Sequence, residues 1–322
     1  MSWNDMMKRL VMGKGTNKNY SAQDLPHNRK QVLKFAYKHR RITILGANLL
    51  ACLFALPFIL FELWTMVVKK MFILDFKTAT DANAYAISQY YFRIPFIMIA
   101  GLGFAGVIYV LRKICWDEPV SFWKDFGKGV KDSYGKFLAF SLILGLFMLL
   151  LEVVSNNLLM GKASFVNVMS IVMLGVLLII GAIFFVYIFA LSSMYNMSFF
   201  GVIKGAFVLT FKKLFTNILM LICGFGPILA LLLLCFVIPY FLYVFLFLLA
   251  FGGLSFMIMV FILFTNKQFD VFINGENYPE YVNKGIYDED LIIEFDEFEK
   301  RTEDEIKSLA EKIAGLDKKD GK

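Results

Sequence analysis

Two carboxylates and one guanidinium are notable because uncharged apolar stretches surround them. Glu62 and Glu152 are the only ionisable residues well inside such stretches, and Arg93 lies at the end of another. Asn156 follows Glu152 by four positions, so the two side chains share a face if this stretch is a helix. Charged groups are costly to bury in a membrane, where they pair with one another or mark a polar site. We therefore expect Arg93 to be the counter-ion, either in a structural ion pair or in a polar site, open to the outside, for a sugar or an ion.

The other chemical motifs argue against catalysis. Residues 101–106 read Gly-Leu-Gly-Phe-Ala-Gly, but a dinucleotide site with this pattern needs a preceding strand and an amphipathic helix. Apolar residues flank the motif on both sides, so close packing of membrane helices through small residues explains it better. His27 and His39 lack the spacing of metal ligands, and the four cysteines resemble small apolar residues. We expect no catalytic set, no metal site and no cofactor.

The composition indicates a membrane protein. The chain is 59% hydrophobic and 18% charged, with a mean hydropathy of +0.65, whereas soluble domains are about 45–50% apolar and about 25% charged. The charged residues gather between long uncharged runs, and a helix needs about 20 apolar residues to cross a bilayer. Lys and Arg flank these runs, as an anionic membrane surface favours. The lipid bilayer is therefore the expected partner, and nucleic acid is not.

The sequence predicts an all-α, polytopic helical membrane protein with six spans in three hairpins. Pro239 lies at the midpoint of an apolar block that is long enough for two spans, so we place a turn there. The predicted spans are 42–68, 92–111, 137–159, 170–191 and the two halves of 216–265, with residues 69–91 as a connector. The chain then divides into a basic segment 1–41, a six-span domain 42–265, and an acidic tail 266–322 that contains an amphipathic helix.

Two amphipathic segments, 119–136 and 198–215, precede the third and fifth spans. Large apolar side chains recur in the first segment at a spacing of four, which is typical of a helix in the membrane interface. These are Phe122, Phe126, Val130 and Tyr134, with Trp123 beside them. The two segments match at an offset of 77 residues. We infer three units, each an interfacial helix followed by a hairpin; the basic helix before the first span fits this scheme more loosely.

Glycine and proline interrupt two of the predicted spans. Gly224, Gly226 and Pro227 fall in the fifth span, and Pro57 falls in the first. Broken helices form binding sites in many transporters. The third and sixth spans show no matching interruption, so helix packing is the favoured interpretation.

The distribution of basic residues predicts the orientation. With the N-terminus in the cytoplasm, 28 of the 33 Lys and Arg residues fall on the cytoplasmic side, as the positive-inside rule requires. We therefore expect both termini in the cytoplasm. The basic N-terminal segment and the acidic tail either dock on each other or are solvated independently.

Several segments resemble a known family. Residues 119–131, which read Pro-Val-Ser-Phe-Trp-Lys-Asp-Phe-Gly-Lys-Gly-Val-Lys after Arg112-Lys113, resemble the first cytoplasmic segment of the YesL-like bacterial membrane proteins. Residues 187–213 are similar to the second cytoplasmic segment of that family, and 269–273 with 284–287 are similar to its ending. The resemblance, over about residues 40–290, implies a bacterial cell membrane and a link to carbohydrate utilisation. It also implies partners such as an ABC transporter or a sensor kinase, and it supplies no catalytic residue.

Two functions remain open at this point. The first is a non-enzymatic accessory protein that supports a membrane transport or sensing complex, because the interfacial helices and charged ends are features that face partners. The second is a small transporter or channel with a polar site near Glu62 and Glu152. The sequence does not predict the oligomeric state.

Overall fold

The computed structural model describes residues 25–71, 76, 78–161, 164–238 and 240–287. All regular elements within these residues are helices, and six of them are long and apolar enough to cross a membrane. The predicted fold class, an all-α polytopic membrane protein, is confirmed. Five spans are formed by α2 (Arg29–Met71), α3 (Ala79–Cys115), α4 (Phe122–Leu159), α5 (Phe165–Met194) and α7 (Leu214–Val237). The sixth span comprises α8 (Phe241–Leu248) and α9 (Leu254–Phe269), and the short helix α6 is Phe199–Lys212.

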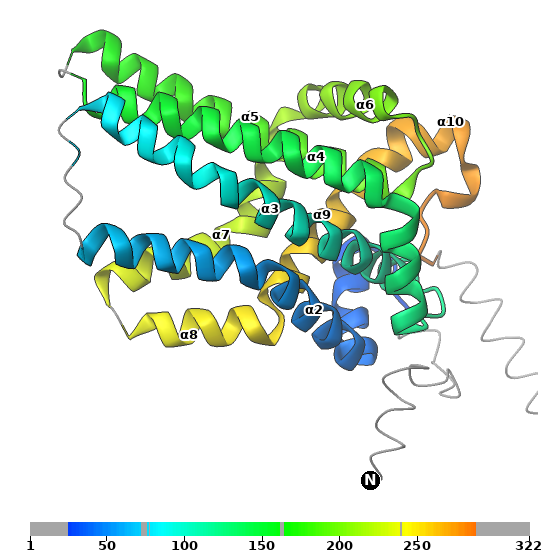
Figure 1. The fold of residues 1–322 in the computed structure, drawn as a ribbon. Coiled ribbons are helices and arrows are strands. Elements are labelled where there is room, and N and C mark those ends of the chain that lie inside the picture. The colour runs from blue at the N-terminus through cyan, green and yellow to red at the C-terminus, as the bar shows by residue number, and fades with distance from the viewer. Residues whose placement is uncertain (1–24, 72–75, 77, 162–163, 239, 288–322) are drawn as a thin grey trace, which may run out of the picture.

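The hairpins all turn at one end of the molecule. In Figure 1 the facing ends of α2 and α3, of α4 and α5, and of α7 and α8 lie at the left, whereas α6 and α10 (Gly275–Asn277) lie at the right. The two ends of the described chain meet at the right-hand end, where the Tyr287 backbone N–H donates to the Pro26 carbonyl at 2.9 Å. An even number of crossings explains why both ends lie on the same side.

The prediction that residues 69–91 form a connector is wrong for the second half of this stretch. Residues 79–91 belong to α3. The Thr78 hydroxyl caps this helix by accepting from the Asp81 N–H at 3.2 Å, and such a cap stabilises a helix start. Alanines at 79, 82, 84 and 86 then favour the helical state. The sequence analysis placed the helix start at the first strongly apolar residue and overlooked this cap.

The two amphipathic segments have different outcomes. The first is not a separate interfacial helix, because α4 continues without interruption from Phe122 into the third span. The second is a separate helix, α6, which ends where Lys213 adopts φ −141° and ψ 62°. The Asn217 side-chain amide donates to the Leu209 and Thr210 carbonyls, both at 2.9 Å, so it satisfies acceptors that a helix end leaves free.

The first span continues the basic helix that precedes it. α2 contains both, with a kink at Arg40, where φ is −120° and ψ is 20°. The predicted boundary at 41–42 therefore coincides with a bend rather than with a loop.

The break in the membrane helices lies in the sixth span and not in the fifth. α7 is continuous through Gly224, Gly226 and Pro227. The sixth span is divided into α8 and α9 by a π-helical turn, Leu249–Gly253, in which Gly252 has φ 145°. The statement that the sixth span has no break is therefore wrong. Residues other than glycine rarely adopt this φ, so the Gly252-Gly253 pair is the feature that permits the break.

α3 is the central span of the bundle. It contacts α2, α4, α5 and α9, and half of its most apolar window is buried, which is the largest share among the six spans. A Cβ added to Gly101 would lie 2.0 Å from the Ser141 hydroxyl oxygen, and one added to Gly103 would lie 2.3 Å from Phe54. The glycine motif at 101–106 therefore lets α2 and α4 approach α3 closely, which confirms the packing interpretation.

Candidate functional site

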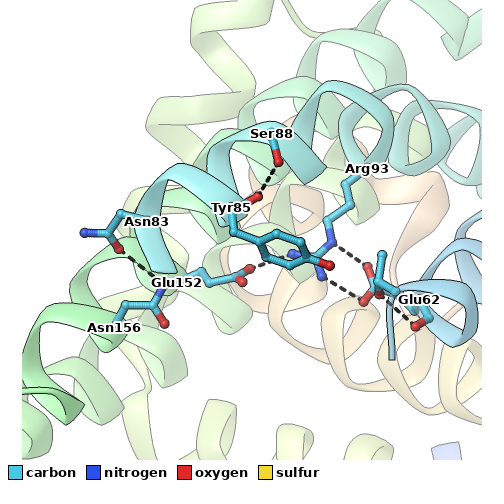
Figure 2. A network of polar contacts seen from close by, with 8 residues as sticks. Glu62, Asn83, Tyr85, Ser88, Arg93, Glu152 and Asn156 are labelled. Atoms are coloured by element: carbon cyan, nitrogen blue, oxygen red, sulfur yellow. Dashed lines mark hydrogen bonds and ion pairs between the residues drawn. The ribbon is translucent and has the colours of Figure 1, made fainter. Parts of the chain in front are cut away.

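The candidate site lies between the first three spans, towards the hairpin-tip end. Glu62 comes from α2, Arg93 from α3 and Glu152 from α4, and Figure 2 shows the guanidinium between the two carboxylates. We call these three residues the ion-pair cluster. Each residue lies on a different helix, so the cluster depends on the register of all three spans.

Arg93 uses both terminal nitrogens for carboxylates. One donates to Glu152 Oε2 at 2.6 Å and the other to Glu62 Oε2 at 3.0 Å. The third guanidinium nitrogen, Nε, lies 2.7 Å from Glu62 Oε1. Two nitrogens thus lie near the Glu62 carboxylate, but only the terminal one donates a hydrogen bond to it, because Nε makes none within the described residues.

The cluster is partly shielded and carries excess negative charge. The Arg93 side chain is 10% exposed, against 26% for Glu62 and 28% for Glu152. One guanidinium cannot neutralise two ionised carboxylates, so the cluster has a formal charge of −1. The exposed part of the cluster therefore belongs mainly to the two glutamate side chains.

Asn156 does not join the ion-pair cluster, although it shares a helix face with Glu152. Its side-chain amide donates to Asn83 Oδ1 at 3.2 Å, which extends the polar contact between α3 and α4 towards the hairpin tips (Figure 2). The sequence analysis missed Asn83 and also Tyr90, whose ring centroid lies 5.0 Å from Arg93 Cζ. Both residues fall in the stretch that was predicted to be a connector. The available signal was their spacing on the face of α3 that carries Arg93.

A cavity of about 320 Å³ adjoins the cluster. Its walls combine the three charged residues with apolar and aromatic side chains: Phe58, Tyr90, Ile97, Met148 and Leu151. Carboxylates next to an aromatic ring suit a small cation or a hydroxylated solute. No group of three or more metal-ligating side chains occurs within the described residues.

Closely packed apolar residues lie between the cluster and the opposite end of the bundle. The sequence has no charged residue between Arg41 and Glu62, between Arg93 and Arg112, or between Lys136 and Glu152. Val107, Val110 and Leu111 of α3 are fully buried in this region, as is Phe140 of α4. A hydrated ion would meet no charged group on this route through the first three spans.

The predicted interfacial face of α4 is divided between the protein core and the surface. Phe122 is buried and Phe126 packs against the core, while Val130 is half-buried. Trp123 and Tyr134 are exposed at 56% and 59%. The buried stripe instead runs through Phe122, Asp125, Gly129, Ser133 and Phe137, because Gly129 admits Tyr109 of α3 at close range.

Asn48, which the sequence analysis did not single out, stabilises the break in the sixth span. Asn48 of α2 is fully buried. Its amide donates to the carbonyls of Leu249 at 2.9 Å and Ala250 at 2.7 Å, and its carbonyl accepts from the Ser255 N–H at 3.0 Å. Backbone groups inside a membrane must be paired, and Asn48 pairs three of those that the π-helical turn affects.

A second charged cluster closes the end of the bundle opposite the hairpin tips. Arg29 forms an ion pair with Asp270 and donates to the Lys284 carbonyl at 2.9 Å. Lys284 Nζ lies 2.7 Å from Glu118 Oε1, and the Tyr287 hydroxyl donates to Asp117 at 2.9 Å. Burial and the nearby Asp117 raise the pKa of Tyr287 to about 12. We call this region the capped end.

The capped end joins the two ends of the described chain. Docking of the basic segment 1–41 on the acidic tail 266–322 was one of two alternatives left open, and contact between them is seen only where the described parts meet. Residues 1–24 and 288–322, including the predicted amphipathic helix of the tail, lie outside the described residues.

Comparisons with protein-family models, with curated proteins and with solved structures found no match. The resemblance to the YesL-like proteins therefore remains a prediction.

Proposed function

We propose that this chain is a non-enzymatic accessory protein of a bacterial cell membrane that supports a transport or sensing complex. The observation that carries the proposal is the closely packed apolar region between the ion-pair cluster and the capped end. A pore needs a continuous polar route, whereas α2, α3 and α4 meet there through glycines and fully buried apolar side chains.

In this proposal the ion-pair cluster is a structural clamp. Arg93 donates from both terminal guanidinium nitrogens to carboxylates of the neighbouring spans, which leaves these two nitrogens little capacity to bind a ligand. The clamp fixes the register of three spans, and so fixes the shape of the surfaces that they present to a partner.

The partner surface in this proposal is on the cytoplasmic side. Exposed aromatic residues lie there next to lysines on α4 and α6: Trp123, Tyr134, Phe200, Phe207 and Phe211 with Lys124, Lys204 and Lys212. Aromatic residues are enriched at binding surfaces. The resemblance to the YesL-like proteins suggests a sugar ABC transporter or a sensor kinase as the partner.

Affinity purification from native membranes tests the proposal. The tagged protein, extracted in a mild detergent, is expected to retain a membrane protein in a stoichiometric amount. A variant in which Phe200, Phe207 and Phe211 are replaced by serine is expected to lose it, while Leu229→Ser on the outer surface of α7 serves as the control. Recovery of the chain alone under conditions that preserve other membrane complexes would contradict the proposal.

The cavity beside the ion-pair cluster supports one alternative, a small-solute or ion transporter. In that case a reconstituted sample would transport a solute, and Glu152→Gln would reduce the flux while the protein remained folded. Vesicles with no flux above empty controls, for a panel of monovalent cations and neutral sugars, would exclude the alternative for those solutes.

A further inference from the structure

We propose that the cavity at the break in the sixth span holds one acyl chain of a membrane phospholipid. The cavity has a volume of about 300 Å³ and lies between α7, α8 and the π-helical turn, with Tyr37 of α2 at one side. It is separate from the ion-pair cluster, since the two cavities share no lining residue.

The cavity exists because the helix is broken and held in that state. Gly252 has a φ of 145°, and a Cβ built on it would meet no atom within 4 Å. The three hydrogen bonds of Asn48 pair backbone groups on both sides of Gly252. A fully buried side chain with this set of bonds stabilises the break, and with it the adjoining cavity.

The walls of the cavity define the chemistry of its occupant. Apart from the Tyr37 hydroxyl, the lining side chains are apolar, and Phe245, Phe251 and Phe256 supply aromatic surface. An apolar cavity of about 150 Å³ is large enough to bind benzene, so this one accepts a larger apolar group. No charged side chain lines it, so a headgroup would have to remain outside.

The position of the cavity selects a lipid over other apolar molecules. Phe251 lines the cavity and is also 62% exposed, and Leu248 is 44% exposed. Both belong to helices that face the bilayer, so the cavity opens onto the lipid. Phospholipid acyl chains are the apolar groups at the highest concentration there, and a chain can enter sideways while its headgroup stays at the interface.

Photo-crosslinking tests the proposal. The protein is reconstituted in nanodiscs that contain a phosphatidylglycerol with a diazirine on one acyl chain, and mass spectrometry maps the adducts after irradiation. We expect saturable labelling at one lipid per chain, concentrated in residues 227–231 and 245–256. Labelling spread evenly over the lipid-facing residues, without saturation, would mean surrounding bilayer lipid only and would overturn the proposal.

Two tryptophan variants provide the matched comparison. Ile228→Trp fills the cavity, whereas Leu229→Trp adds the same group at the neighbouring position, which is 55% exposed and does not line the cavity. Ile228→Trp is expected to reduce labelling about tenfold. This is the loss of affinity expected when about two methylene groups of the acyl chain no longer fit in the apolar cavity. Leu229→Trp is expected to leave labelling unchanged.

A third variant keeps the test decisive if Ile228→Trp fails to fold. Phe245→Ala enlarges the same cavity and is expected to increase the labelled fraction at subsaturating lipid. Equal labelling of the native chain, Leu229→Trp and Phe245→Ala would contradict an acyl-chain site.

Discussion

At the residue scale, Arg93 is the side chain on which the ion-pair cluster depends. Removing it in Arg93→Ala leaves Glu62 and Glu152 facing each other without a cation. Breaking a buried ion pair costs about 3–5 kcal/mol, and the partial exposure of both carboxylates places the expected loss near about 3 kcal/mol. Thermal unfolding in detergent, followed by circular dichroism, measures the change. A melting temperature equal to that of the native chain would contradict the clamp.

Glu152→Gln is the milder test of the same cluster. Arg93 keeps its two contacts with Glu62, and the carbonyl oxygen of a neutral amide at position 152 can still accept from the terminal nitrogen that now donates to Glu152. We expect a loss of stability smaller than that of Arg93→Ala, in the same unfolding assay. If Glu152→Gln changed neither stability nor partner recovery, a role for this carboxylate would be excluded.

Asn48 provides an independent prediction because it pairs three backbone groups. Each buried group left unpaired costs about 1–3 kcal/mol, so Asn48→Ala is expected to destabilise the protein more than Asn157→Ala. Asn157 is an exposed control whose side-chain amide donates within its own helix, to the Val153 carbonyl. Hydrogen exchange of residues 249–256 is expected to increase in Asn48→Ala. Unchanged exchange there would show that Asn48 does not hold the break.

The candidate site was largely predictable from residue types. A charge in an apolar run is conspicuous in any sequence, and the costs of burying it imply a partner, which is why Glu62, Arg93 and Glu152 could be grouped. Asn83 and Tyr90 were overlooked, because their spacing from Arg93 indicates a shared helix face only if α3 begins at Ala79 rather than at residue 92. Asn48 is a single amide in an apolar run, and nothing local indicates that its partners lie about 200 residues away.

At the element scale, the break in the sixth span requires glycine at position 252. Gly252→Ala is expected to destabilise the protein by about 1–3 kcal/mol, since only glycine adopts this backbone conformation without strain. Gly175→Ala in α5 is the matched control, because its Cβ would meet no neighbouring atom and alanine favours the helix. Paired thermal unfolding of the two variants measures the difference. Equal effects would show that the break relaxes without cost.

The segment that ends at Tyr287 depends on a second glycine. Gly285 has φ 79°, and a Cβ on it would lie 2.2 Å from the Cys115 carbonyl. We expect Gly285→Ala to detach residues 278–287 from the turn after α3. Limited proteolysis measures this as faster cleavage within the segment, with Gly135→Ala, which has open space around it, as the control. Equal cleavage rates would contradict this packing.

Element boundaries were less predictable than the spans themselves. Runs of bilayer length identify each span, but the length of a helix beyond its apolar part depends on caps and on breaks. The Thr78 cap lets α3 begin at Ala79, well before its apolar part. The amphipathic start of α4 is continuous with the third span, because no helix break lies between them. Gly252 lies in a long uncharged run, and a Gly-Gly pair in such a run is a weak indication of a helix break. The hydrogen bonds from Asn48 of α2 to the backbone of Leu249, Ala250 and Ser255 form only when the spans pack together, so the local sequence does not indicate them.

At the scale of the whole molecule, the bundle has two different ends, and closely packed apolar residues of α2, α3 and α4 lie between them. The hairpin-tip end carries the ion-pair cluster and its cavity, and the capped end joins both ends of the described chain (Figure 1). The proposed partner surface and the proposed orientation belong together. If the capped end faced outward, the exposed aromatic residues of α4 and α6 could not meet a cytoplasmic partner.

Labelling of single cysteines in intact cells tests this orientation most directly. The four native cysteines are replaced by alanine, and Thr80→Cys at the start of α3 or Lys131→Cys near the start of α4 is added; both positions are exposed. A membrane-impermeant maleimide is predicted to label Thr80→Cys before lysis and Lys131→Cys only afterwards, while a permeant maleimide labels both. Labelling of Lys131→Cys in intact cells, with Thr80→Cys protected until lysis, would contradict the account.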